Sequence, residues 1–76
     1  MQDDIVYHIL KFAKENNGIF KVSSFKYIAD PPKTWYEKQL LMESLVSRGY
    51  FDKYRGDGSH IFLYRLTLLG REVLEL

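Results

Sequence analysis

The chain has 76 residues, which allows a single domain spanning residues 1–76, and its lack of cysteine excludes disulfides and thiolate metal sites. A hydrophobic fraction of 46% is too high for a disordered chain, and a net charge of +1 is low for a nucleic-acid-binding protein. No long apolar run follows the acidic start, so we expect no signal peptide, no membrane partner and a cytoplasmic location.

The first predicted element is an amphipathic helix that begins after Asp3 or Asp4. Either carboxylate accepts free N–H groups at the positive end of a helix dipole. Apolar residues follow at helical spacing: Ile5, Val6, Ile9, Leu10 and Ala13. Gly18 is expected to end this helix in the left-handed conformation.

Two short elements are predicted next. The apolar residues 19–22 favour a short strand that pairs with a later hairpin. Ser23 or Ser24 is suited to cap a second helix over residues 25–29. Two prolines in residues 30–32 must stop that helix, because the residue before a proline is excluded from the helical region.

A third helix is predicted from Thr34 to about Arg48, with Gly49 as its stop. Thr34 and Glu37 have the spacing of a capping box, in which each side chain binds the backbone N–H of the other residue. One face of this helix is apolar, with Trp35, Leu41, Met42, Leu45 and Val46. We expect Trp35 to pack in the core or at the helix edge rather than to serve as a base-stacking platform. The opposite face carries Tyr36, Leu40, Glu43 and Ser47.

The rest of the chain predicts a β-hairpin followed by a short helix. Residues 51–55 and 61–66 are aromatic and β-branched, and the glycine-rich residues 56–60 between them are typical of a turn. Tyr64 and Leu66 share one face of their strand and are expected to close over the helices. Thr67 is expected to cap the last helix, in which Gly70 permits a close backbone contact.

This order of elements resembles the winged helix-turn-helix domain of small transcriptional regulators of the MarR and PadR type. The matching residues are Leu45 with Arg48-Gly49-Tyr50-Phe51, and Tyr64-x-Leu66-Thr67-x-x-Gly70. The resemblance implies an α+β fold that is mainly α. Its expected parts are a three-helix core, a short strand, a two-stranded wing and a short C-terminal helix.

The resemblance further implies binding of double-stranded DNA and a role in transcription regulation, with the third helix in the major groove and the wing on the neighbouring backbone. The residues expected to contact phosphate are Lys33, Thr34, Lys53 and Arg55, with Ser59 and His60 adding hydrogen bonds at the wing tip. The candidate base readers are Tyr36, Gln39, Leu40 and Glu43. Between Lys21 and Arg65, eight basic and five acidic residues give this region a net charge of +3.

An alternative reading is a winged helix that binds another protein. Glu37 and Glu43 make the outward face of the third helix acidic, and Tyr36 with Leu40 is an apolar pair suited to a protein contact. Lys53 and Arg55 then need no ligand, because alternating charges are ordinary on a solvent-facing strand.

Catalysis and bound cofactors are not expected. The chain contains no nucleophile elbow, phosphate loop or histidine metal motif, and His8 and His60 have no companion ligands at metal spacing. The last helix carries more apolar residues than one small core face requires. These residues either close the core of their own chain or support a homodimer, which would suit a palindromic DNA site.

Overall fold

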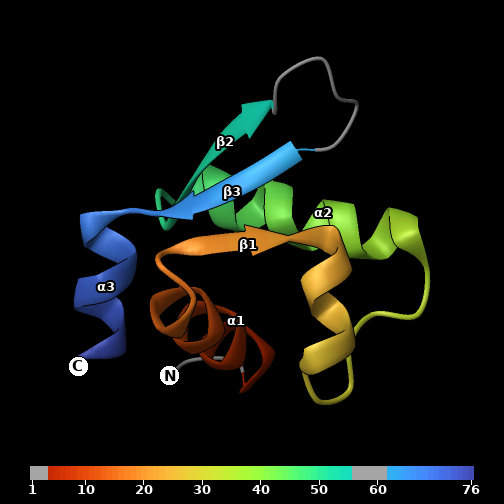
Figure 1. Cartoon of the computed structure of the whole chain (residues 1–76), viewed down its shortest axis with the longest axis horizontal. Helices are drawn as coiled ribbons and strands as arrows, with labels where there is room; N and C mark the ends of the chain where they lie inside the picture. Colours follow the sequence, from red (N-terminus) through yellow and green to blue (C-terminus); the bar gives the residue numbers. More distant parts are fainter. Residues whose placement is uncertain (1–3, 56–61) are drawn as a thin grey trace.

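The structure is a computed structural model that describes residues 4–55 and 62–76. Its elements, in chain order, are helix α1 (Asp4–Glu15), strand β1 (Ile19–Lys21), 3₁₀ helix η1 (Val22–Tyr27), helix α2 (Trp35–Ser47), strands β2 (Phe51–Arg55) and β3 (Phe62–Leu66), and helix α3 (Leu68–Leu74). The fold is α+β, with the helices packed against one three-stranded antiparallel sheet (Figure 1). Within the described ranges, every helix is too short or too polar to cross a lipid bilayer.

The sheet joins the two halves of the chain. Its strand order is β1-β3-β2, so β3 lies between the other two strands. β1 pairs with β3 in the register that places Ile19 opposite Arg65, and β2 pairs with β3 in the register that places Phe51 opposite Leu66. The predicted pairing of residues 19–22 with the hairpin is therefore confirmed for Ile19–Lys21.

The core is formed by apolar side chains from every layer of the fold. Phe20 of β1 lies at its centre, and its ring meets those of Phe12 and Phe25 edge to face at centroid distances of 5.7 and 5.1 Å. Burial of each such large side chain contributes about 1.5–3 kcal/mol. The buried hydrophobic residues are Val6, Ile9, Leu10, Ala13, Phe20, Phe25, Ile28, Met42, Leu45, Phe51, Tyr64 and Leu66.

Two glycines end helices as predicted. Gly18 has φ +79° and its N–H donates to the Ala13 carbonyl at 2.6 Å, which closes the last turn of α1. Gly49 has φ +85° directly after α2. A side chain is strained in this left-handed region, so both positions favour glycine.

The predicted cap and close contact of the last helix are confirmed. The Thr67 hydroxyl accepts a hydrogen bond from the Gly70 N–H at 3.1 Å and donates one to the Gly49 carbonyl at 2.6 Å. A Cβ on Gly70 would lie 2.6 Å from the Tyr50 carbonyl oxygen and 2.6 Å from Cδ1 of Leu66. The absence of a side chain at residue 70 is what lets α3 approach the strand that begins after Tyr50.

The predicted helix over residues 25–29 is wrong. The helix in this region is a 3₁₀ element of six residues, η1, which begins at Val22 and is stabilised by a hydrogen bond from the Lys21 N–H to the Ser24 hydroxyl at 3.2 Å. Ile28 is already extended, with φ −102° and ψ 137°, and Asp30 is left-handed with φ +51°. Asp30, which precedes Pro31, lies outside the right-handed helical region as the proline predicts, but the chain has already left the helix at Ile28.

Trp35 is also misassigned by the sequence pattern. It is expected in or beside the core, but its side chain is 64% exposed, whereas Met42 and Leu45 on the same stripe are buried. The first turn of α2 extends beyond the part of the helix that the core covers. Trp35 therefore reaches the surface, where it borders a groove.

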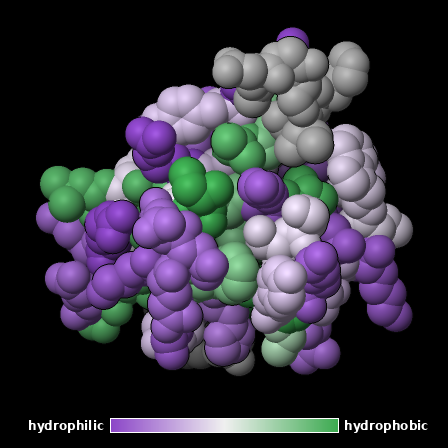
Figure 2. Space-filling model, viewed as in Figure 1, coloured by the Kyte–Doolittle hydropathy of each residue, from purple (hydrophilic) through white to green (hydrophobic). Residues whose placement is uncertain are grey.

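The surface mixes polar and apolar groups. Figure 2 shows mainly hydrophilic side chains on one face, with hydrophobic side chains at its left edge, over α3. Leu68 and Leu69 of α3 are both exposed. The predicted homodimer is consistent with these residues and stays a prediction.

Candidate nucleic-acid interface

Helix α2 carries most of the predicted site residues and is fixed at its start by the predicted capping box. The Glu37 N–H donates to the Thr34 hydroxyl oxygen at 3.1 Å, and the Thr34 N–H donates to the Glu37 carboxylate at 3.2 Å. The Thr34 hydroxyl also donates to that carboxylate at 3.0 Å. Thr34 is therefore engaged as a helix cap, and Lys33 beside it is exposed.

The outward face of α2 is partly apolar. Tyr36 is 67% exposed and Leu40 is 50% exposed, while Gln39 and Glu43 are half-buried. This confirms the predicted division of the helix into two faces for Tyr36 and Leu40. Four candidate base readers lie within two turns of one helix, so they share a single stretch of surface.

Lys53 of β2 joins the hairpin to this helix. Its ammonium forms an ion pair with the Glu43 carboxylate, and the two side chains are 28% and 41% exposed. The same ammonium lies 4.2 Å from the centroid of the Phe62 ring. Lys53 is thus held between an acid of α2 and an aromatic ring of β3, and its charge is largely compensated by Glu43.

The prediction that Lys53 and Arg55 face solvent is confirmed for Arg55, which is exposed, and is wrong for Lys53, whose side chain is only 28% exposed. They alternate with Asp52 and Tyr54, and they share the face of β2 that begins with the buried Phe51. That face is directed toward the helices. Arg55 is nevertheless exposed, because the hairpin extends past the part that α2 covers, and its guanidinium carbon lies 5.2 Å from the Phe62 ring centroid. The structure therefore brings Lys53 and Arg55 to the side of the sheet on which α2 lies.

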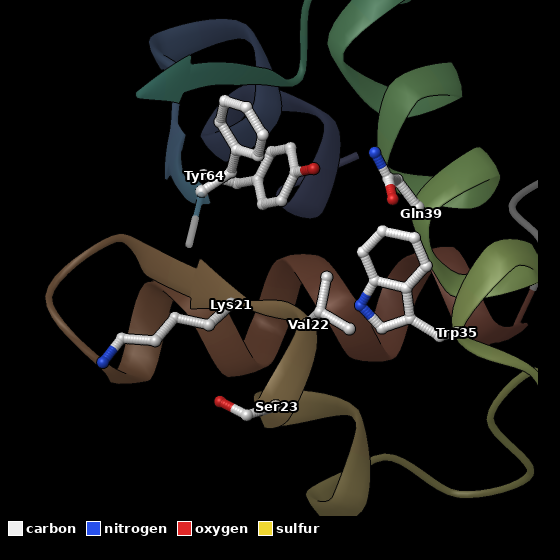
Figure 3. A pocket seen from close by; sticks show the side chains of 7 residues that line it. Lys21, Val22, Ser23, Trp35, Gln39 and Tyr64 are labelled. Carbon is white, nitrogen blue, oxygen red and sulfur yellow. The ribbon is translucent and has the colours of Figure 1, made fainter. Parts of the chain in front are cut away.

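A groove of about 430 Å³ opens beside the N-terminal half of α2. Figure 3 shows the side chains of Trp35, Gln39 and Tyr64 directed toward one another across it, with Lys21 extending at the opposite side. The complete lining is Lys21, Val22, Ser23, Trp35, Gln39, Phe62 and Tyr64. Of these, only Gln39 belongs to the predicted site.

The other lining residues were missed for a physical reason. Phe62 and Tyr64 occupy alternate positions of β3, which indicates a shared face but not what the face meets. Lys21 and Ser23 come from the junction of β1 and η1, and only the antiparallel pairing of β1 with β3 brings that junction beside β3. A signal for the groove existed in the exposed position of Trp35 in the first turn of its helix, but its apolar spacing favoured the core.

The Tyr64 hydroxyl is the group in this region with a perturbed acidity. Burial raises the pKa of its phenol above the ordinary value. Two nearby charges have smaller effects: the Lys53 ammonium lowers this pKa and the Glu43 carboxylate raises it. The phenol is therefore neutral at physiological pH.

Two predicted site residues, Ser59 and His60, lie outside the described residues, as does the predicted turn at residues 56–60. Among residues 4–55 and 62–76, no three histidines, cysteines or acids come together in a way that would hold a metal ion.

Comparison with models of protein families, with curated proteins and with solved structures found no match for the chain. Its function is therefore inferred from the geometry and chemistry of its own surface.

Proposed function

We propose that the chain is a DNA-binding winged-helix protein, a small cytoplasmic transcription regulator without enzymatic activity, that contacts duplex DNA through α2 and the β2–β3 hairpin. The observation that carries the proposal is the meeting of α2 with the hairpin on one surface, where Glu43 is paired with Lys53. The order of the elements and the pairing of β1 with the hairpin agree with the layout on which the resemblance rests.

In this proposal α2 enters the major groove, which is about 12 Å wide and admits one helix. Tyr36 and Leu40 are exposed on the outward face of α2 and would meet base edges and thymine methyl groups. Lys33 at the start of α2 and Arg55 on the hairpin would contact phosphates on either side of the groove.

Lys53 has a conditional role in the same scheme. Its ammonium is paired with Glu43 in the free protein, so a phosphate has to replace the carboxylate before Lys53 adds to affinity. The carboxylate freed in this way could accept a hydrogen bond from a cytosine amino group. The Glu43–Lys53 pair thus links backbone binding to base contact.

The proposal is tested with a fluorescent random-sequence duplex whose anisotropy is followed at about 50 and 200 mM salt. Binding should weaken steeply with salt, because released counterions drive it. Lys53→Ala combined with Arg55→Ala should lower the affinity and reduce the slope of log K against log salt by up to about two. Lys11→Ala with Lys14→Ala on α1 removes the same charge elsewhere and is the control.

Two results would overturn the proposal. One is the lack of salt-dependent binding to any duplex. The other is an equal loss of affinity in the α1 control, because binding would then reflect net charge and not this surface.

A second candidate function is a protein-interaction module. The ion pair that compensates Lys53 and the exposure of Tyr36 and Leu40 favour it, because an apolar patch with little net charge suits a protein partner. Two results together would establish this alternative. The protein would not bind duplex DNA, and it would form a complex with another protein that Tyr36→Ser and Leu40→Ser abolish.

A further inference from the structure

The groove beside α2 has a chemical character that duplex binding does not use. We propose that it accepts an unpaired nucleobase of a nucleic-acid strand bound to the same surface. This inference rests on the proposed nucleic-acid binding and extends it from the paired to the unpaired form of the ligand.

The lining suits a flat aromatic ring. Trp35 of α2 and Phe62 and Tyr64 of β3 surround the groove, which has a volume of about 430 Å³. The indole is 64% exposed, so most of its surface is available for stacking. Stacking on such side chains is the main way in which proteins hold bases of single strands, because every base has a π face.

Polar groups at the groove match the edge of a base. Gln39 directs its amide toward Trp35 and Tyr64 (Figure 3) and offers both a donor and an acceptor. Ser23 is a further polar residue of the lining. A purely aliphatic ligand would leave the Gln39 amide without a partner, which disfavours it.

Charge around the groove indicates an anionic chain. Lys21 belongs to the lining, and its side chain extends away from Trp35, Gln39 and Tyr64 at the edge of the groove (Figure 3). On the other side, the Lys53 ammonium and the Arg55 guanidinium carbon lie 4.2 and 5.2 Å from the Phe62 ring centroid. No acidic residue in the described part of the chain lines the groove, and the nearby Glu43 is paired with Lys53. A strand whose phosphates meet these cations while one base enters between them fits this distribution.

The base must be unpaired to enter. In a duplex both faces of a base are covered by its neighbours, and an enzyme or binding protein reaches them only after the base has left the stack. A single strand, a gap or a bulge provides such a base without that cost.

The sole tryptophan of the chain gives a direct assay, because Trp35 itself lines the groove. Intrinsic fluorescence is followed while the protein is titrated with an oligothymidylate strand of about ten nucleotides. An abasic strand of the same length carries the same charge without bases and serves as the matched ligand. We expect quenching with oligothymidylate and little with the abasic strand.

Variants separate stacking from charge. Phe62→Leu should weaken oligothymidylate binding about tenfold, and Gln39→Ala about threefold, as read from the same titration. Tyr7→Leu replaces an exposed aromatic residue on α1, away from the groove, and should leave the binding unchanged. Circular dichroism and thermal unfolding of each variant check that it is folded. If Phe62→Leu does not fold, Gln39→Ala alone tests the proposal.

The outcomes distinguish the two proposals. Three results would overturn the groove inference: equal quenching by both strands, no quenching by either strand, or unaltered oligothymidylate binding in the folded variants. Duplex anisotropy reports separately on the proposed function. Duplex binding without oligothymidylate quenching rejects the groove and retains the function, and failure of both assays rejects both. Quenching by an acidic, phenylalanine-containing peptide in place of the oligonucleotide would assign the groove to a protein ligand and also overturn the inference.

Discussion

Replacement of Glu43 by glutamine should strengthen the binding of duplex DNA. The ion pair with Lys53 must be broken before the ammonium meets a phosphate, and Glu43→Gln removes the charge that competes with phosphate while keeping the size of the side chain and one acceptor oxygen for a cytosine amino group. The substitution also removes a negative charge from the proposed interface. Both effects act in the same direction.

The structure sets the magnitude. The Glu43 side chain is 41% exposed and the Lys53 side chain 28% exposed, so solvent screens the pair and it contributes only about 0–1 kcal/mol. Releasing that energy raises affinity by up to about fivefold at low salt. Glu43 competes with phosphate for Lys53 in the unaltered protein, so Glu43→Gln should make the slope of log K against log salt steeper by at most about 0.9, the contribution of one full phosphate contact. The free energy of unfolding should fall by less than about 1 kcal/mol.

The assay is duplex anisotropy at several salt concentrations, with Glu72→Gln on α3 as the control that makes the same change in net charge. The role given to Lys53 is supported if duplex affinity rises in Glu43→Gln but not in Glu72→Gln, and if the affinity of Glu43→Gln depends more steeply on salt. An unchanged slope, or the same gain in Glu72→Gln, would show that Lys53 is no phosphate contact. Lys53→Ala made in the Glu43→Gln background should remove the gain.

Three further predictions concern stability. Gly70→Ala should lower the free energy of unfolding, measured by urea denaturation, by about 1–2 kcal/mol. The added Cβ would lie 2.6 Å from the Tyr50 carbonyl oxygen and from Leu66, and the cost of this overpacking exceeds the better helix propensity of alanine. An equal or higher stability of the variant would contradict this contact. Thr34→Ala should cost about 1 kcal/mol through loss of the cap, whereas Thr34→Ser should restore most of it. Stability should decline as pH rises above about 10, the ordinary tyrosine pKa, because the unfolded chain then ionises while the raised pKa keeps the buried Tyr64 phenol neutral. Tyr64→Phe should reduce this decline above about pH 10, and an identical decline in both proteins would refute the assignment.

Features with a local cause were predictable from the sequence. The cap formed by Thr34 and Glu37 involves residues three apart, and a hydroxyl and a carboxylate at that spacing have one favourable arrangement at a helix start. Gly18 and Gly49 ended their helices for similarly local reasons. The burial of Tyr64 on the inward face of β3 followed from simple alternation.

Features that depend on how elements meet were not predictable in the same way. Lys53 and Arg55 lie on the same face of β2 as the buried Phe51, whereas their charge suggested the face of the strand that is directed toward solvent. The ion pair of Glu43 with Lys53 requires α2 and β2 to lie at one particular distance, which the turn at Gly49 determines. Trp35 has the helical spacing of the apolar residues of α2, but it lies in the first turn, beyond the part of the helix that packs on the core.

The position of β3 between β1 and β2 has a consequence for folding kinetics. Ile19 and Arg65 are neighbours in the sheet although they are 46 positions apart in the sequence. Such non-local pairing slows folding, because the entropy of closing the intervening segment is lost before the contacts between β1 and β3 form. During synthesis, the edge strand that follows α1 has no partner until β3 has left the ribosome. We therefore expect fragments that stop after β2 to lack a stable sheet, and the complete domain to fold in one cooperative step.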